Sequence, residues 1–136
     1  MHSKAKGNIG EMAVAKDLML KGYSVFYELG DLSKIDLIAL KNKKTFKVQV
    51  KTKWNTTNGT CSADLRSSGP GYSYKYTEDD IDIIACYAAD RDIVFYVNVK
   101  DIISNNTRGL TIRLDKPKNN QTKGINLLEN YLDINV

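Results

Sequence analysis

The sequence predicts an α/β fold with a mixed central β-sheet flanked by helices. Three observations lead to this fold class: a helical pattern over residues 4–21, two β-rich runs of alternating polarity at 35–40 and 45–51, and further apolar runs at 81–88 and 93–97. A chain of 136 residues suits one domain, which can bury about two thirds of the surface of its unfolded chain. We therefore expect a single domain over residues 1–136.

The opening segment, residues 4–21, has apolar positions at helical spacing, and Gly22 suits the left-handed backbone conformation that ends many helices. At about 100° per residue, Glu11 lies on the same side as Ala15 and Leu18. A solvated glutamate is expected on the opposite side. The sequence therefore predicts that Glu11 points to the apolar face, although it could also lie at the edge of an imperfect apolar stripe.

Residues 35–40 and 45–51 predict a β-hairpin with a four-residue connection, Lys41-Asn42-Lys43-Lys44. Side chains alternate between the two faces of a strand. The second strand thus has an apolar face (Phe46, Val48 and Val50) and a polar face (Lys47, Gln49, Lys51 and Lys53). We expect the first strand to direct Asp36 to this polar face.

The remaining segments complete the expected sheet and its surroundings. Residues 24–28 predict an early strand and residues 61–66 a later one, and the apolar run at 81–88 indicates a strand buried on both faces. Asp82, at the head of this strand, is predicted to hold the tyrosine-rich segment before it. The other expected elements are a strand at 93–97, a helical turn at 99–103, a strand at 110–114, a polar, basic loop at 116–123 and apolar positions at helical spacing in 125–132.

The polar side chains of the hairpin have the chemistry of a site that binds a metal ion and a phosphate. Asp36 offers the hard oxygen ligand that Mg²⁺ requires, and the side-chain carbonyl of Gln49 or the backbone carbonyl of Val50 offers a second. Lys51 could neutralise charge on a scissile phosphate or orient the attacking water. With Glu11 as a further acid, we expect one or two Mg²⁺ ions held by these oxygen groups.

These residues carry a resemblance to a known family. Glu11, Asp36 and the run Gln49-Val50-Lys51 resemble the active-site motif of the PD-(D/E)XK nuclease superfamily, and the glutamine in place of the second acid resembles its group I intron homing endonucleases. Ile35 stands where the motif has proline. The resemblance extends to the segments 64–68, 76–82 and 117–121.

The resemblance implies a restriction-endonuclease-like fold and a Mg²⁺-dependent, site-specific endonuclease that hydrolyses phosphodiester bonds of double-stranded DNA. The products would be a 5′ phosphate and a 3′ hydroxyl. It implies catalytic roles for Glu11, Asp36, Gln49 and Lys51, and metal binding by Asp36, Gln49, Val50 and Glu11. Because Gln49 is neutral, metal affinity should fall or depend more on Glu11.

Three other functions remain open at this point. Archaeal Holliday junction resolvases also have a helix glutamate and this hairpin, but their motif ordinarily has an acid where this chain has Gln49. The chain could also be a DNA-binding module of the same fold with a dead nuclease site. A purely structural partner protein is the third alternative, and the cluster of lysines disfavours it.

Basic residues are distributed unevenly. The net charge is +4 and the isoelectric point about 9.0, but six lysines and no acid lie between Lys41 and Lys53, which suits a polyanionic partner. Residues 67–76 lack periodicity and combine tyrosines with a lysine, so we expect a flexible loop that contacts DNA. The alternatives are a solvated hairpin tip and an ordered loop packed by its own tyrosines. The expected DNA contacts are Lys41, Lys43, Lys44, Lys47, Lys53, Arg66, Tyr72, Tyr74 and Lys75.

The same composition indicates the partners and the compartment. Cutting both strands of a duplex requires at least two copies of so small a domain, so a homo-oligomer is expected, either a dimer or the tetramer that the resemblance implies. No small-molecule substrate is expected. No apolar run approaches the roughly 18 residues needed to cross a bilayer, no signal core is present, and Cys61 and Cys86 do not form a disulfide framework. We expect an intracellular, cytoplasmic protein without membrane contact.

Overall fold

The computed structural model describes residues 1–117 and 123–134. The first half of the chain forms helix α1 (Ser3–Leu20) and strands β1 (Ser24–Tyr27), β2 (Leu37–Lys41) and β3 (Lys44–Lys53). The rest comprises β4 (Thr60–Asp64), β5 (Arg66–Gly69), β6 (Tyr72–Lys75), β7 (Ile83–Ala88), the 3₁₀ turn η1 (Ala89–Arg91), β8 (Ile93–Asn98), α2 (Val99–Ser104), β9 (Gly109–Arg113), β10 (Asn126–Leu127) and the 3₁₀ turn η3 (Leu128–Asn130). None of the helices in the two described ranges has both the length and the apolar character needed to span a bilayer.

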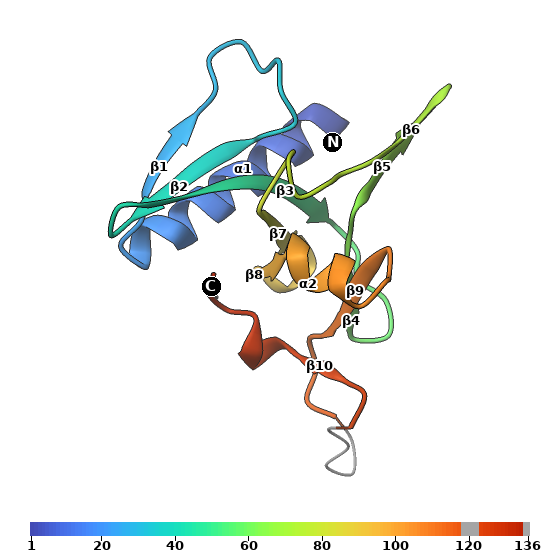
Figure 1. The fold of residues 1–136 in the computed structure, drawn as a ribbon. Coiled ribbons are helices and arrows are strands. Elements are labelled where there is room, and N and C mark those ends of the chain that lie inside the picture. Colours follow the sequence, from blue (N-terminus) through green and yellow to red (C-terminus); the bar gives the residue numbers. More distant parts are fainter. Residues whose placement is uncertain (118–122, 135–136) are drawn as a thin grey trace.

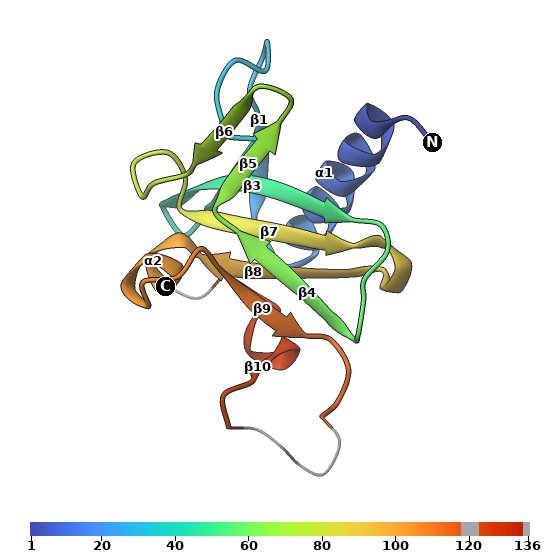
Figure 2. The same cartoon turned by 90° about the vertical axis from the view of Figure 1, so that its right-hand side faces the viewer.

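The central sheet has the strand order β1-β2-β3-β7-β8, and α1 lies along one of its faces (Figure 1). Only β3 and β7 pair in parallel, while the other neighbours are antiparallel. A second sheet of strand order β10-β9-β4 lies across the opposite face together with α2 (Figure 2). The predicted α/β class with a mixed central sheet is therefore confirmed.

The central sheet has a core on each face, because the apolar side chains of β7 alternate between the two faces while β3 contributes its apolar side chains to one of them. One core packs α1 on the sheet and includes Val14, Leu18, Leu37, Val48, Val50, Ile83 and Ala85. The other packs α2 and the second sheet on the opposite face and includes Cys61, Leu65, Ile84, Cys86, Phe95, Ile102 and Ile112. Both cysteines are free and buried. A β7 buried on both faces agrees with its continuous apolar run.

The turn between β2 and β3 is shorter than predicted. Lys41 already pairs with Lys44, so the connection has two residues, Asn42 and Lys43, rather than four. Both adopt left-handed backbone conformations, with φ of 53° and 67°. Two such residues give the turn a twist that matches the twist of the strands it joins.

The prediction of a flexible loop at 67–76 is wrong, because this segment forms the hairpin β5–β6. Arg66 pairs with Lys75, and Gly71, with φ of 80°, supports the reversal. At the base of the hairpin, the Tyr74 ring meets the Tyr76 ring edge-on, with centroids 5.6 Å apart. No alternating pattern marks these strands because, among the hairpin side chains that the structure describes, only Tyr74 packs against a core and the others are exposed.

The C-terminal prediction also needs correction, since residues 125–132 form no regular helix. Asn126 of β10 pairs in parallel with Ile112 of β9, and the 3₁₀ turn η3 follows. The next segment returns to the central sheet, where the Tyr96 amide donates to the Tyr131 carbonyl at 2.8 Å. Of the polar loop predicted at 116–123, residues 118–122 lie outside the described ranges.

Asp82 has a structural role, but it differs from the predicted one. Its carboxylate accepts a hydrogen bond from the Lys47 amide at 2.8 Å, and its carbonyl accepts one from the Val99 amide at 3.0 Å. Asp82 therefore joins β3 to the start of α2 rather than holding the tyrosine-rich hairpin.

Candidate active site

The candidate site lies beside the first residue of β2, where β3 extends beyond its pairing with β2. The β2–β3 ladder begins with Leu37 opposite Val48, whereas β3 stays paired with β7 as far as Lys53. The first unpaired amide on this edge, that of Val50, donates to the Asp36 carboxylate at 2.7 Å. The edge of β3 beyond this contact is open, so side chains from both faces of the sheet can meet there.

Helix α1 reaches this open edge through a close contact at Gly10. A Cβ atom at this position would lie 1.8 Å from the Thr52 Oγ1 atom and 3.0 Å from its Cβ, so any larger residue would push the helix from β3. The next residue, Glu11, lines a cleft together with Asp36, Gln49, Val50 and Lys51. The structure thus brings together all the predicted catalytic and metal-binding residues.

The two carboxyl groups in the cleft interact with each other. Partial burial, followed by the charge of Asp36, raises the pKa of Glu11 to about 7. Burial also raises the pKa of Asp36, while its hydrogen bonds with the Val50 amide and Glu11 oppose this rise. Near neutral pH, Glu11 can therefore donate its proton to the Asp36 carboxylate, and a cation that replaced this proton would relieve the repulsion between them.

Gln49 supplies a further oxygen atom. Its Oε1 atom is buried and has no hydrogen-bond partner in the described part of the protein, which is costly for a polar atom. Among residues 1–117 and 123–134, no group of three or more His, Cys, Asp or Glu side chains could hold a metal ion. The donor set of two carboxyl groups and one amide oxygen nevertheless fits a hard divalent cation that prefers oxygen ligands.

Lys51 approaches the same cleft from the face of β3 that lies opposite α1. Its Nζ atom donates to the Arg66 carbonyl at 3.2 Å and lies 5.1 Å from the centroid of the Tyr76 ring. Burial lowers the pKa of Lys51, and the nearby carboxylates of Asp64 and Asp36 oppose this effect. The ammonium group is thus fixed by the base of the β5–β6 hairpin.

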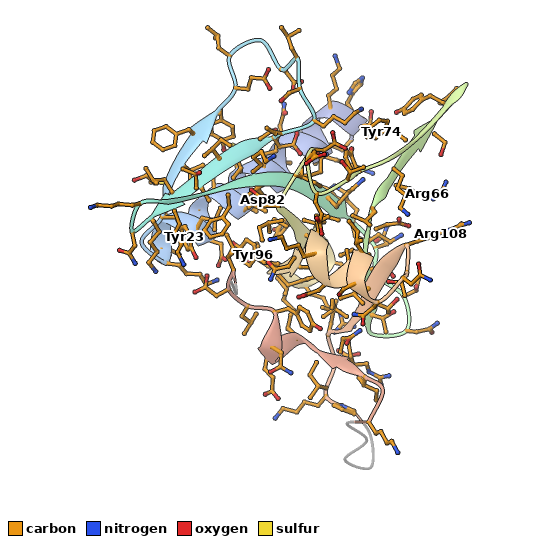
Figure 3. The ribbon with its side chains drawn as sticks, viewed as in Figure 1. Tyr23, Arg66, Tyr74, Asp82, Tyr96 and Arg108 are labelled. Carbon is orange, nitrogen blue, oxygen red and sulfur yellow. The ribbon has the colours of Figure 1, made fainter. Side chains whose placement is uncertain are left out.

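The lysines of the β2–β3 turn are not brought to the cleft. Lys44 is six residues before Val50, which in a strand corresponds to about 20 Å. The Lys41 Nζ atom donates to the Lys21 carbonyl at 2.8 Å and lies 5.0 Å from the Tyr23 ring centroid. Figure 3 shows Tyr23 far from Arg66 across the molecule. Lys41, and with it the turn, therefore lies at the end of α1 remote from the cleft.

The other predicted DNA contacts lie closer to the cleft than the lysines of the β2–β3 turn. Lys53 is exposed at the end of β3, and the Lys47 Nζ atom donates to the Asp79 carbonyl at 2.7 Å. The remaining four residues, Arg66, Tyr72, Tyr74 and Lys75, belong to the β5–β6 hairpin. Arg66 and Tyr74 lie on opposite strands of this hairpin (Figure 3). Since the Arg66 carbonyl binds Lys51, the hairpin is attached directly to the site.

Sequence reasoning missed several residues of the cleft and its surroundings. Tyr76 lies beside Lys51, Gly10 sets the position of the helix, and Lys6 and Trp54 line the cleft. For Gly10, a glycine within a helical pattern was an available signal, because such a residue often marks a close packing contact. Nothing in the spacing of the other three indicated that they would meet.

Comparison with known proteins identifies the class to which this fold and site belong. A family model described as PD-(D/E)XK endonuclease matches residues 1–134. The chain therefore belongs to the PD-(D/E)XK endonucleases, which confirms the resemblance found in the sequence. Nucleases of this family typically use divalent metal ions.

The chain is similar to two individual proteins. The structure is similar to that of the bacterial homing endonuclease I-Ssp6803I, with a TM-score of 0.72 and 26% sequence identity over 90% of this chain and 84% of that one. Protein 5.3 of Escherichia phage T7 is 37% identical over 91 residues, which are 66% of this chain and 75% of the phage protein.

Proposed function

We propose that this endonuclease hydrolyses double-stranded DNA at specific sites and depends on Mg²⁺. The observation that carries the proposal is the convergence of the Glu11–Asp36 pair, the unpartnered Gln49 oxygen and the Lys51 ammonium in one cleft. Similarity to a homing endonuclease supports site-specific cutting of this kind, and homing is the biological role that we propose.

Each side chain has a role that follows from its chemistry. Asp36 and Glu11 would bind the ion once their shared proton is lost, and the Gln49 amide oxygen or the Val50 carbonyl would complete the protein ligands. Bound Mg²⁺ supplies an activated water molecule and neutralises charge on the phosphate. Lys51, held by the Arg66 carbonyl, would stabilise the charge that develops on the phosphate or orient the water.

The proposed assembly is a homo-oligomer of two or four copies. One cleft acts on one phosphodiester bond, so a double-strand cut requires a second copy facing the other strand. Closed symmetry places two identical clefts on a site whose halves are related by the same symmetry. We propose an intracellular location, with double-stranded DNA as the substrate.

A cleavage panel tests the proposed function. We expect wild-type protein with Mg²⁺ to cut a subset of a duplex library at defined sequences, and Lys51→Ala to cut about 10²–10³-fold more slowly, as when one stabilising donor is lost. Preferential cutting of four-way junctions without regard to sequence would identify a resolvase instead. Equal DNA binding by both proteins, with no cutting in Mg²⁺ or Mn²⁺, would identify a binding module without nuclease activity.

Metal binding is expected to stabilise the protein more at pH 8 than at pH 5.5. Below the Glu11 pKa of about 7, a proton competes with the ion, whereas above it the carboxylate is free. In a thermal melt, saturating Mg²⁺ should raise Tm by about 3 °C or more at pH 8 and much less at pH 5.5. Glu11→Gln should remove most of this difference.

The stability of the metal-free protein should depend on pH in the opposite direction, and this dependence serves as a control. Glu11 has a higher pKa in the folded protein than its ordinary value of 4.5, so the folded state binds the proton more tightly. Its contribution to the free energy of unfolding is greatest below pH 4.5 and is lost as the pH rises through 7. An equal rise in Tm with Mg²⁺ at both pH values would contradict metal binding by the Glu11–Asp36 pair.

A further inference from the structure

A lysine of α1 occupies the wall of the cleft beside the carboxyl pair. Lys6 and Trp54 line the same cleft as Glu11 and Asp36, and the Lys6 Nζ atom lies 5.6 Å from the centroid of the Trp54 indole ring. Within residues 1–117 and 123–134, the ion pairs are Lys21–Asp17 and Arg91–Asp115. Lys6 therefore presents a positive charge to the cleft without a carboxylate to neutralise it.

The position of Lys6 follows from the packing that places Glu11. Gly10 contacts Thr52 of β3, and one helical turn earlier Lys6 lies over Trp54, two residues beyond Thr52. Helix α1 and the end of β3 thus continue side by side past the carboxyl pair. Lys6 is five residues from Glu11, or about 7.5 Å along the helix axis.

This part of the wall is open to a large ligand. Gly7 also lines the cleft, and a Cβ atom there would have no neighbour within 4 Å. The cleft wall here belongs to the N-terminal end of an 18-residue helix, where the helix dipole adds to the positive potential. The Lys6 ammonium group lies over the Trp54 ring, and this cation–π contact helps to hold the lysine at the cleft.

We infer that Lys6, supported by Trp54, binds a DNA backbone phosphate that neighbours the scissile one. The inference rests on the proposed nuclease function and adds a phosphate subsite to it. Lys6 and Glu11 line one cleft and are separated by about 7.5 Å along the helix axis. Successive phosphates of one strand rise about 3.4 Å along the duplex axis, so a strand that crosses the carboxyl pair brings a phosphate close to the scissile one past Lys6. A DNA strand bound at Lys6 would have its scissile phosphate held in position at the carboxyl pair.

The salt dependence of DNA binding tests this subsite. We would measure the affinity for a fluorescent 30-base-pair duplex of mixed sequence in EDTA, between about 50 and 250 mM KCl. Each phosphate contact contributes about −0.9 to the slope of log K against log salt, so Lys6→Ala should flatten the slope by about 0.9. At about 0.1 M salt, the same contact corresponds to an affinity about eightfold lower in the variant.

Lys16→Ala is the matched control, because Lys16 is an exposed lysine of the same helix outside the cleft and the charge change is identical. The slope should stay as in wild type for Lys16→Ala and for Lys6→Arg, and circular dichroism checks the fold of each variant. An unchanged slope for Lys6→Ala, or an equal change in Lys16→Ala, overturns the subsite. If that occurs while wild-type protein cuts DNA, the proposed function stands; if wild type neither binds nor cuts, the proposed function fails first.

Discussion

Asp36→Asn is expected to slow cleavage by at least about a hundredfold and at the same time to make the protein more stable. Loss of the carboxylate removes a ligand of the proposed ion, whose stabilisation of the transition state is worth several kcal/mol. Since about 1.4 kcal/mol corresponds to a factor of ten in rate, cleavage should fall by at least about a hundredfold. The measurement is the single-turnover rate of cleavage with saturating protein.

The gain in stability has an electrostatic cause. Burial raises the pKa of Asp36 above its ordinary value of 3.8, so its ionised form destabilises the folded state at neutral pH. An asparagine is neutral and can still accept the hydrogen bond from the Val50 amide. We expect the free energy of unfolding to rise by about 0.5–2 kcal/mol at pH 8, as in other relieved functional sites, and the gain to disappear in acid.

The change should also be visible at Glu11. Part of the rise in the Glu11 pKa to about 7 comes from the charge and the hydrogen bond of Asp36. In Asp36→Asn the Glu11 pKa should therefore fall toward its ordinary value of 4.5, which an NMR titration of the side-chain carboxyl carbon measures. An unchanged Glu11 pKa would show that the two carboxyl groups do not interact.

Asp82→Asn is the matched control for Asp36→Asn. Asp82 also accepts a hydrogen bond from an amide of β3, that of Lys47, but it does not line the cleft. The substitution therefore removes the same charge from a comparable contact. Cleavage should remain within about threefold of wild type, because the variant makes no change at the reacting groups. A comparable loss in both variants would place the effect in β3 itself rather than in the cleft.

Gly10→Ala is expected to displace α1 and to reduce cleavage at least tenfold. The added Cβ would lie 1.8 Å from Thr52 Oγ1, so helix and strand must separate. Overpacking costs about 1–3 kcal/mol, and the better helix propensity of alanine recovers at most about 1 kcal/mol. Glu11 moves with the helix, and a displacement of about 1 Å at a reacting site can cost a hundredfold in rate. Chemical denaturation and single-turnover cleavage measure the two effects.

Two further variants separate packing from helix propensity. Gly7→Ala adds the same methyl group to the same helix at a position where it meets no atom within 4 Å, so this variant should be stabilised rather than destabilised. Thr52→Ala removes Oγ1 and should recover part of the stability and activity of Gly10→Ala. Additive effects of the Gly10 and Thr52 substitutions would contradict the proposed contact.

The position of the lysine cluster illustrates a limit of sequence proximity. Three lysines, Lys41, Lys43 and Lys44, lie near the motif in the sequence. The simplest expectation is that they contact the DNA that is bound at the site. A strand advances about 3.3 Å per residue, so the turn lies about 20 Å from Val50. In addition, the Lys41 ammonium donates a hydrogen bond to the Lys21 carbonyl at the end of α1. Lys6 is 43 positions before Gln49 in the sequence, yet it lines the same cleft as that residue.

Local patterns were sufficient for the elements that carry the site. Helical spacing predicted α1, although Glu11 is not among the buried residues of that helix and lines the cleft instead. The two-residue alternation of β3 placed Gln49 and Lys51 on one face. Both patterns arise within one element that buries one face, which is why a single sequence reveals them. For the same reason the hairpin β5–β6 was not recognised, since among its described side chains only Tyr74 packs against a core.

The sequence by itself determined the α/β class and the residues that belong to the motif. Only the tertiary structure decided that β2 pairs with β3 no further than Val48, which leaves the later part of β3 open on that side. It also decided that Gly10 lets α1 reach Thr52 and that the Arg66 carbonyl of the hairpin fixes Lys51. Each of these contacts joins elements that are distant along the chain. Their geometry depends on how whole helices and strands pack, and no local periodicity of polar and apolar residues records that packing.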